Sequence, residues 1–339
     1  MNEQNGFYPP QQNGNFYGMP DAMRVARKKR EKHELRLQST FASCAVLSLI
    51  LIQNISVLIL SILGLYKRYT TEPFFQAGVD IIIMLLSLLL PFVVFGKLIE
   101  KQSGLNDSLP FERPKAKGLM LPAIISGLGF CMVANIITNV MTSFVGAFGV
   151  ELSSPDIPMP QGVFGVIVSF FRVVVLAAFI EEIAFRGYIM QNLRKFGDGF
   201  AIAMAALVFG LMHCNLIQAP FALIVGFALG YLSIKTGTLW AAVIIHGLNN
   251  SISLIVTYLN GKVDETLLNN AASLMIYALI FAAVPCFFVF VRRANALPSF
   301  KTRTELSTGE KVLCYLTTPT MIIAIILMLY FTAQYVKLV

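Results

Sequence analysis

Residues 177–188 read AAFIEEIAFRGY, and they place two adjacent acids and an arginine inside an apolar run at about 172–193. A helix needs roughly 20 apolar residues to cross the hydrocarbon of a membrane. An ionisable side chain in the middle of such a run costs at least ~2.5 kcal/mol on insertion scales, so it is retained where it faces a bundle interior. The stretch therefore predicts a membrane helix whose charged residues face other helices and have a function there.

The composition of the whole chain agrees with a membrane protein. Of its 339 residues, 56% are hydrophobic and only 13% are charged, whereas a soluble domain has about 25% charged residues. Such sparse charge, combined with long apolar runs, predicts an all-α fold, namely a polytopic integral membrane helix bundle surrounded by lipid. The net charge of +8 lies in a few loops and one tail, so we predict no nucleic-acid partner.

Nine segments are long and apolar enough to be candidate spans, and the number falls to eight if two short central segments do not fully cross. We therefore expect about eight to nine transmembrane helices. The candidates lie at about 41–65, 77–97, 119–144, 172–193, 199–215, 219–234, 238–258, 270–291 and 312–335. In the sixth candidate, Gly226 and Gly230 form a GxxxG pattern, which is typical of close helix packing.

Loops rich in lysine and arginine alternate along the chain with loops that contain few of them. Cytoplasmic loops of membrane proteins carry the excess of these residues, so the alternation predicts a cytoplasmic N-terminus and a C-terminus on the other side. The location that we expect is a bacterial plasma membrane. The basic residues assigned to the cytoplasmic side are Arg24, Arg27, Lys28, Lys29, Arg30, Lys32, Arg36, Lys97, Lys101, Arg113, Lys115, Lys117, Arg194, Lys195, Lys235, Arg292, Arg293, Lys301, Arg303 and Lys311.

The first 39 residues differ in composition from the rest of the chain. Residues 1–22 are rich in Asn, Gln, Gly and Pro, and residues 23–38 are dense in Lys and Arg. The first segment cannot bury a core, and the second could form a short helix on anionic lipid. We favour a solvated retention signal and predict that residues 1–39 are a disordered, basic cytoplasmic tail.

Two histidines share the unusual placement of the two acids. His213 and His246 both lie in apolar runs, and helical spacing of four residues relates Phe209 to His213 and His246 to Asn250. Residues four apart lie on one face of a helix. These pairs therefore predict polar faces on two further segments.

The same spacing separates the roles of the two adjacent acids. Glu182 and Arg186 are four residues apart and can form an ion pair, while Glu181 points about 100° away because a helix turns that far per residue. Glu182 is thus expected to be neutralised by Arg186, which leaves Glu181 free for chemistry.

The depths of these residues also match. Counted from the cytoplasmic turn at 195–198, Glu181 and His213 lie roughly 21 and 22 Å into the membrane at 1.5 Å per residue. From the turn at 235–237, His246 and Asn250 lie roughly 14 and 20 Å deep on the same basis. Three segments therefore deliver polar groups to overlapping depths, which predicts one buried site.

Such a site has the groups needed for amide hydrolysis. A carboxylate can act as general base on water, and a neighbouring histidine can share and orient that water. A second histidine with an asparagine amide can donate to an oxyanion. The same atoms could instead hold a divalent metal, since carboxylate and two imidazoles are common zinc ligands.

The ordered set Glu181-Glu182-x-x-x-Arg186, Phe209-x-x-x-His213 and His246-x-x-x-Asn250 resembles the CPBP family, the CAAX proteases and bacteriocin-processing enzymes that are also called Abi. The resemblance covers about residues 160–255. It implies that Glu181 is the base, that His213 is its partner, and that His246 with Asn250 stabilises the oxyanion. Glu182, Arg186 and Phe209 would then be supporting residues.

The resemblance also implies the substrates and the domain organisation. The partners would be membrane-embedded or lipid-anchored substrates, either CAAX-type prenylated proteins or small secreted, bacteriocin-like peptides. Residues 40–339 would form a transmembrane protease domain with a motif-bearing core at about 160–258. The alternatives are an ion- or proton-coupled transporter, since intramembrane Glu and His can relay protons, and a non-catalytic immunity or scaffold protein.

The family is often labelled as metalloproteases, and a metal such as zinc would use Glu181, His213 and His246 as ligands. We expect instead that no cofactor is required. A metal-bound histidine usually donates its second nitrogen to a carboxylate, and the nearest spare carboxylate, Glu182, is expected to pair with Arg186. Asn250 also suits an oxyanion better than zinc, which prefers Cys, His and carboxylate.

Overall fold

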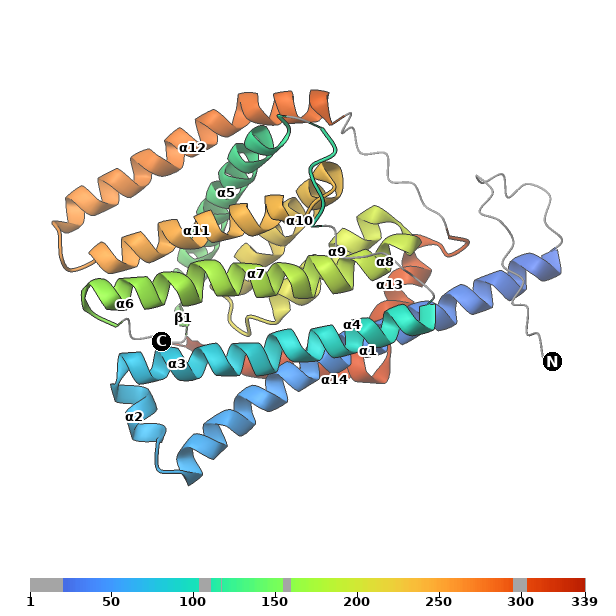
Figure 1. Cartoon of the computed structure of the whole chain (residues 1–339), viewed down its shortest axis with the longest axis horizontal. Helices are drawn as coiled ribbons and strands as arrows, with labels where there is room; N and C mark the ends of the chain where they lie inside the picture. The colour runs from blue at the N-terminus through green and yellow to red at the C-terminus, as the bar shows by residue number, and fades with distance from the viewer. Residues whose placement is uncertain (1–20, 104–110, 117, 155–159, 295–303, 339) are drawn as a thin grey trace.

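The computed structural model describes residues 21–103, 111–116, 118–154, 160–294 and 304–338 and is almost wholly helical (Figure 1). The all-α bundle predicted from the sequence is confirmed. The first half comprises α1 (Asp21–Ile62), α2 (Tyr66–Thr71), α3 (Pro73–Met84), a π-helical turn (Leu85–Leu89), α4 (Leu90–Ser103), α5 (Met120–Gly146) and β1 (Val150–Leu152).

One long helix then runs from 162 to 196 as α6 (Gly162–Ser169), a π-helical turn (Phe170–Leu176), α7 (Ala177–Glu182), a second π-helical turn (Ile183–Met190), α8 (Gln191–Leu193) and a 3-10 turn (Arg194–Phe196). It is followed by α9 (Asp198–Leu211), α10 (Gln218–Thr236), α11 (Trp240–Leu259), α12 (Glu265–Arg293), α13 (Thr308–Leu316), α14 (Pro319–Ala333) and β2 (Val336–Leu338).

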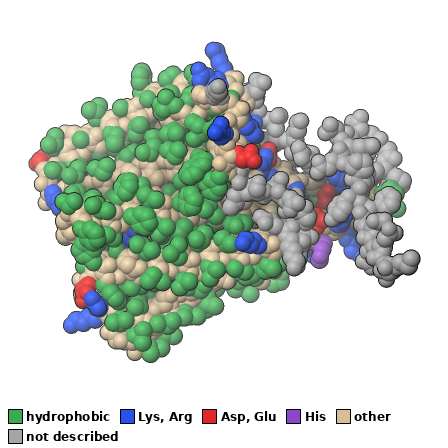
Figure 2. Space-filling view, viewed as in Figure 1, with side chains coloured by type: hydrophobic (Ala, Val, Ile, Leu, Met, Phe, Trp, Pro, Cys, Tyr) green, Lys and Arg blue, Asp and Glu red, His purple; other side chains and the backbone are tan. Residues whose placement is uncertain are grey.

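The outside of the bundle is apolar. Large hydrophobic side chains such as Phe164, Leu274 and Phe281 are more than 60% exposed. Figure 2 shows hydrophobic side chains over most of the visible face, with most of the charged side chains toward one end and a few at the opposite edge. Water would not tolerate so large an apolar surface on a monomeric soluble protein. The chain is therefore an integral membrane protein.

Among the described residues, seven helices are long and apolar enough to span a membrane, or eight if the bent pair α13 and α14 is one span. The sequence analysis counted eight to nine, and the difference is α9. This helix has 14 residues, which gives a length of about 21 Å, short of the ~30 Å hydrocarbon thickness. The predicted span at 199–215 is thus a partial one, and the chain turns back through residues 212–217 into α10.

The N-terminal region corrects the expected tail. Helix α1 has 42 residues, which is about 63 Å of helix, so its first half continues beyond the apolar part. Residues 21–39 are helical rather than disordered, while residues 1–20 lie outside the described residues. The physical reason is that this half makes ion pairs and hydrogen bonds to Lys195 and to residues 304–310, while Arg24 and Arg30 stay 53% and 75% exposed.

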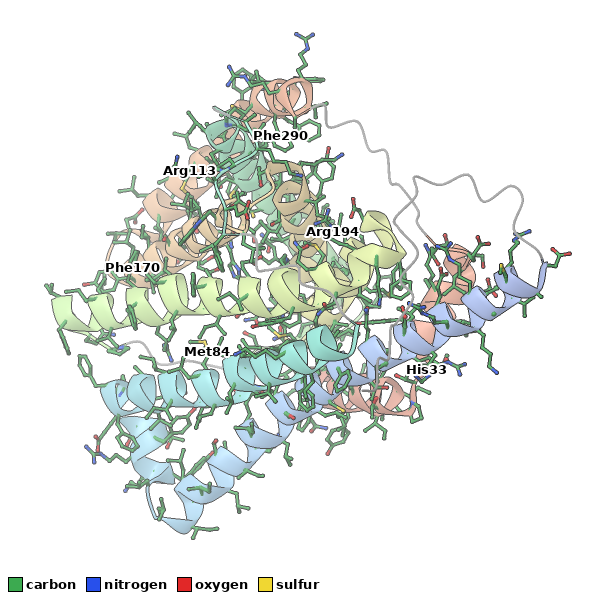
Figure 3. All side chains as sticks on the ribbon, turned by 45° about the vertical axis from the view of Figure 1, so that its right-hand side comes forward. His33, Met84, Arg113, Phe170, Arg194 and Phe290 are labelled. Atoms are coloured by element: carbon green, nitrogen blue, oxygen red, sulfur yellow. The ribbon has the colours of Figure 1, made fainter. Side chains whose placement is uncertain are left out.

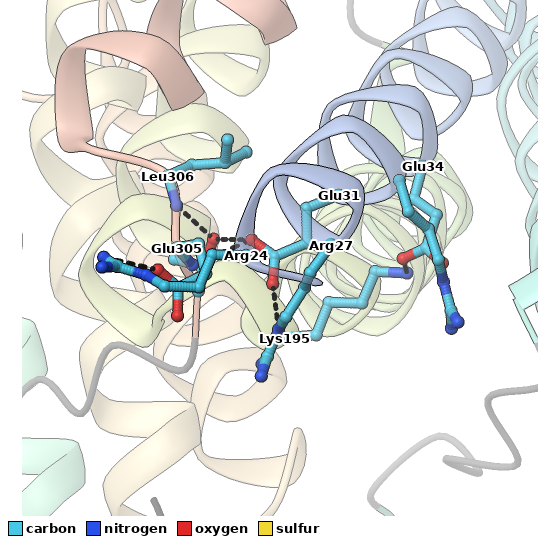
Figure 4. A network of polar contacts seen from close by, with 9 residues as sticks. Arg24, Arg27, Glu31, Glu34, Lys195, Glu305 and Leu306 are labelled. Atoms are coloured by element: carbon cyan, nitrogen blue, oxygen red, sulfur yellow. Dashed lines mark hydrogen bonds and ion pairs between the residues drawn. The ribbon is translucent and has the colours of Figure 1, made fainter. Parts of the chain in front are cut away.

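Figure 4 shows this pairing, which joins the basic half of α1 to two other segments. Glu31 accepts hydrogen bonds from Thr304 Oγ1 at 2.6 Å and from the backbone N–H of Glu305 at 2.9 Å. Glu34 binds Lys195 at 3.1 Å. Further ion pairs join Arg24 to Glu305 and both Lys28 and Lys32 to Glu310.

The loops that the sequence assigned to one side of the membrane do lie at one end of the bundle. Besides the contacts of α1, Lys115 donates its backbone N–H to Thr236 O at 2.9 Å, Arg293 donates to Gly118 O at 2.8 Å, and Lys311 donates to Phe196 O at 3.0 Å. At the opposite end, β1 pairs antiparallel with β2 (Figure 1). The described start of α1 and the strand β2 therefore lie toward opposite ends of the bundle, and which end faces the cytoplasm remains a prediction.

Topology reporters test that orientation. One reporter inserted near Asp156 and another near Leu297 should report opposite sides, with the second in the cytoplasm, because β1 and the end of α12 lie at opposite ends of the bundle. The two insertion points lie outside the described residues. Reporters on one and the same side would contradict the arrangement, and opposite sides with Leu297 outside would reverse the orientation.

Candidate active site

The two acids lie midway along the long helix of residues 162–196. Figure 3 shows Phe170 toward one end of this helix and Arg194 at the other. The acids end α7, and π-helical turns flank α7 on both sides. Such turns are rare and occur frequently at functional sites.

Glu182 joins two helices through one oxygen. Its Oε1 accepts from Arg186 Nη1 at 3.0 Å and from His246 Nδ1 at 2.9 Å, and its side chain is 0% exposed. The predicted ion pair with Arg186 is therefore present. The sequence analysis did not foresee His246 as the second partner, because only the packing of α11 against α7 brings it to the same oxygen.

With Glu182 ionised, this contact assigns a proton to Nδ1 of His246. The carboxylate can only accept, so Nδ1 donates to Glu182 and the other nitrogen, Nε2, faces the site. Glu181 Oε2 lies 3.8 Å from that Nε2, and the two side chains are 16% and 11% exposed. Glu181, which the sequence analysis expects to be free of Arg186, is thus directed toward His246.

His213 lies on the turn that follows α9 rather than inside a spanning helix. Its Nδ1 lies 2.8 Å from Phe209 O, and a carbonyl can only accept, so Nδ1 donates and Nε2 remains for the site. Asn215 holds this turn, since its Nδ2 donates to His213 O at 2.9 Å and its Oδ1 accepts from the Gln218 N–H at 2.8 Å. Irregular backbone at membrane depth is stable only when protein groups satisfy it.

Phe209 is the common contact of the charged and imidazole groups. Its ring lies 4.3 Å below the Arg186 guanidinium carbon, 5.1 Å from the His213 ring and 6.2 Å from the His246 ring. Arginine over an aromatic face is a favourable contact. The structure therefore brings the three predicted segments together around one aromatic side chain.

Asn250 is anchored to the backbone of the long helix. Its Nδ2 donates to Val173 O at 2.9 Å, in the π-helical turn Phe170–Leu176. An amide group has two N–H donors, so this bond orients the side chain and leaves a second N–H.

Gly226 and Gly230 of α10 let this helix approach its neighbours closely, and Gly226 lies beside Arg186. A Cβ built on Gly226 would lie 2.9 Å from Ala206 Cβ and 3.5 Å from Arg186 Nη2, whereas one on Gly230 would meet Met190 and Ile202 at 3.2–3.3 Å. The close packing predicted from this glycine pair is confirmed. Among the described side chains, Glu182 Oε2 and Arg186 Nη2 are buried without a hydrogen-bond partner.

The described part of the chain contains no group of three or more His, Cys, Asp or Glu placed to hold a metal ion. Glu181, His213 and His246 are therefore not assembled as a ligand set in this structure. The expectation that Glu182 pairs with Arg186 alone is wrong, because Glu182 also accepts a hydrogen bond from His246. Glu182 thus supplies the carboxylate contact that a metal-bound histidine usually has, and the expectation of a metal-free site stays a prediction.

The sequence analysis missed Asn215 and Val173. Asn215 is 1% exposed, and an asparagine just after His213 in an apolar stretch was a signal for a turn. Val173 acts through its carbonyl, and no side-chain pattern marks a backbone acceptor.

Comparison with known proteins gives one match. Residues 163–252 match the family model described as Type II CAAX prenyl endopeptidase, Rce1-like. The match confirms the resemblance predicted from the Glu181, His213 and His246 motifs and covers nearly the same residues. No curated protein and no solved structure matches the chain.

The glycine contacts give a stability prediction. Gly226→Ala should lower the free energy of unfolding by about 1–3 kcal/mol, as overpacking does, because the new methyl group meets Ala206 of α9. Gly230→Ala is the matched control and should be near neutral, since the side chains it meets can shift. Thermal unfolding in detergent measures both variants, and equal melting temperatures would contradict the packing.

Proposed function

We propose that this protein is an intramembrane endopeptidase that hydrolyses peptide bonds with a water activated by Glu181. The observation that carries the proposal is the facing pair of Glu181 Oε2 and His246 Nε2, 3.8 Å apart and largely buried, with His246 held by Glu182. A base and a polarised imidazole in an apolar bundle are suited to proton transfer. The family match supports intramembrane endopeptidase activity in general.

In the first step, the Glu181 carboxylate removes a proton from water as the water oxygen attacks the scissile carbonyl carbon. The C–O bond forms, and the carbonyl π electrons move to its oxygen. His213 orients the same water through Nε2, the nitrogen that is not bonded to Phe209 O. Burial of these groups makes each electrostatic contact stronger than in water.

The tetrahedral oxyanion then needs donors. Asn250 offers its second N–H, since the first is fixed on Val173 O. His246 donates from Nε2 when both of its nitrogens carry protons, while Glu182 keeps Nδ1 in place. The C–N bond breaks as the oxyanion collapses, and the proton on Glu181 passes to the leaving amine.

The substrates that we propose are membrane-associated polypeptides. The site lies on a bundle with an apolar exterior, so a substrate held in lipid can reach it without leaving the membrane. The matched family is described by its action on prenylated CAAX sequences, and a lipid-anchored C-terminus is therefore the first class to test. Small secreted, bacteriocin-like peptides are the second.

Replacing Glu181 or Glu182 by glutamine distinguishes the catalytic base from the residue that supports it. Glu181→Gln should lower cleavage at least ~100-fold, because general base catalysis is worth that much or more, with the melting temperature nearly unchanged. Glu182→Gln should lower the stability, since removing one partner of a buried pair costs about 3–5 kcal/mol. The measurements are cleavage of a fluorogenic farnesylated CAAX peptide and of an unmodified apolar peptide, together with thermal unfolding.

The outcome that reverses the assignment is specific. A Glu181→Gln variant that cleaves normally, beside a folded Glu182→Gln variant that does not cleave, would make Glu182 the base. Cleavage of neither peptide by the wild type would remove the proposed substrate classes.

We further propose that hydrolysis requires no metal. The described residues present no metal-ligand group, and Arg186, bonded to the same carboxylate as His246, opposes a second positive charge nearby. Purified active protein should retain its activity after prolonged chelation and contain less than stoichiometric metal. Stoichiometric zinc, with activity lost on its removal and restored by adding zinc, would overturn this mechanism.

A further inference from the structure

A second polar cluster joins α2, α3 and the long helix, and it includes none of the proposed catalytic side chains. Asp80 of α3 and Arg172 of the long helix form an ion pair through Oδ2, and Tyr69 Oη donates to Asp80 Oδ1 at 2.8 Å. The side chains of Asp80 and Arg172 are 23% and 10% exposed. Charged side chains within membrane helices are costly and mark function by default.

The pair lies one residue away from the anchor of Asn250. Arg172 and Val173 both belong to the π-helical turn Phe170–Leu176. The Arg172 side chain reaches α3, while the Val173 carbonyl accepts the Asn250 amide of α11. This turn is therefore held from two sides, by an ion pair and by the asparagine.

The approach of α11 to this turn is close. A Cβ on Gly247 would lie 3.4 Å from Val174 O, so α11 packs directly on the turn whose Val173 carbonyl binds Asn250. The Phe74–Phe164 pair, stacked with centroids 5.6 Å apart, also joins α3 to α6 of the long helix. The two helices are therefore held by an apolar contact as well as by the ion pair, and their adhesion does not require a charged pair.

We propose that Asp80 and Arg172 are positioning residues, which set the π-helical turn so that Val173 O holds Asn250 in its oxyanion-binding orientation. The inference rests on the proposed function, because the role of Asn250 as a donor belongs to it. Asp80 acts through Arg172 and touches neither substrate nor water in the site.

The test is a double-mutant cycle of Asp80→Asn and Asn250→Ala in the full-length protein, read on the farnesylated CAAX peptide and the unmodified peptide. Losing one oxyanion donor lowers kcat by about 10²–10³-fold, and misplacing it through Asp80→Asn should lower kcat by about 10-fold with KM unchanged. In the Asn250→Ala background, Asp80→Asn should have no further effect on kcat. Losses that multiply would overturn the proposal, since a general structural role is independent of Asn250.

Three further variants control for folding. Phe74→Ala perturbs the same pair of helices without removing charge, so it should lower the melting temperature and leave kcat within about twofold, by the reasoning that independent sites do not couple. Tyr69→Phe removes only one of the two donors to Asp80. If the Asp80→Asn variant does not fold, Tyr69→Phe takes its place in the cycle. Asp80→Glu should restore part of kcat, and a Phe74→Ala variant with the same loss of kcat would overturn the proposal.

A second readout does not need catalysis. Asp80→Asn should increase the hydrogen exchange of backbone amides in residues 170–178 and near Asn250, whereas Phe74→Ala should not do so near Asn250. Unchanged exchange near Asn250 would overturn the positioning role. If the wild type cleaves neither peptide but Asp80→Asn still increases exchange at Asn250, the proposed function fails while the structural coupling is upheld.

Discussion

The arrangement of the candidate active site depends on one oxygen atom, Glu182 Oε1, which accepts hydrogen bonds from Arg186 and His246 at the same time. A carboxylate with no exposure to solvent is stable only if it is paired and hydrogen-bonded. Because its two partners lie on different helices, α7 and α11 are held in one register. The same contact turns His246 Nε2 toward Glu181, so the neutralisation of one acid positions the groups around the other.

The packing around this oxygen follows from small and aromatic residues. Gly226 allows α10 to approach α9 beside the Arg186 guanidinium, and Phe209 lies beneath that guanidinium and next to both imidazoles. Helix association within lipid relies on such close packing, because lipid offers no hydrophobic driving force between helices. The short helix α9 and the turn fixed by Asn215 then place His213 inside the bundle rather than at its end.

Residue type and spacing were enough to predict the helical class, the grouping of the loops and the convergence of the three motif segments. Periodicity could show that Glu182 and Arg186 share a face, because both lie on one helix. It could not show His246 as a partner, since that contact depends on how two helices cross. For the same reason it could not show the contact of Asn215 with His213 O after α9, nor the Val173 carbonyl that holds Asn250. The basic half of α1 was predicted to be disordered because its contacts with residues 304–310, more than 260 positions away, cannot be seen from spacing along one helix.

The central claim is that Glu181 activates water for peptide-bond cleavage in the membrane. The most direct measurement is mass spectrometry of membrane-derived peptides from cells that carry the wild-type chain or Glu181→Gln, expressed to equal levels. The account predicts a defined set of new peptide termini that appears only with the wild type, on membrane-embedded or lipid-anchored proteins. Identical termini in the two samples, with both proteins folded in the membrane, would contradict it.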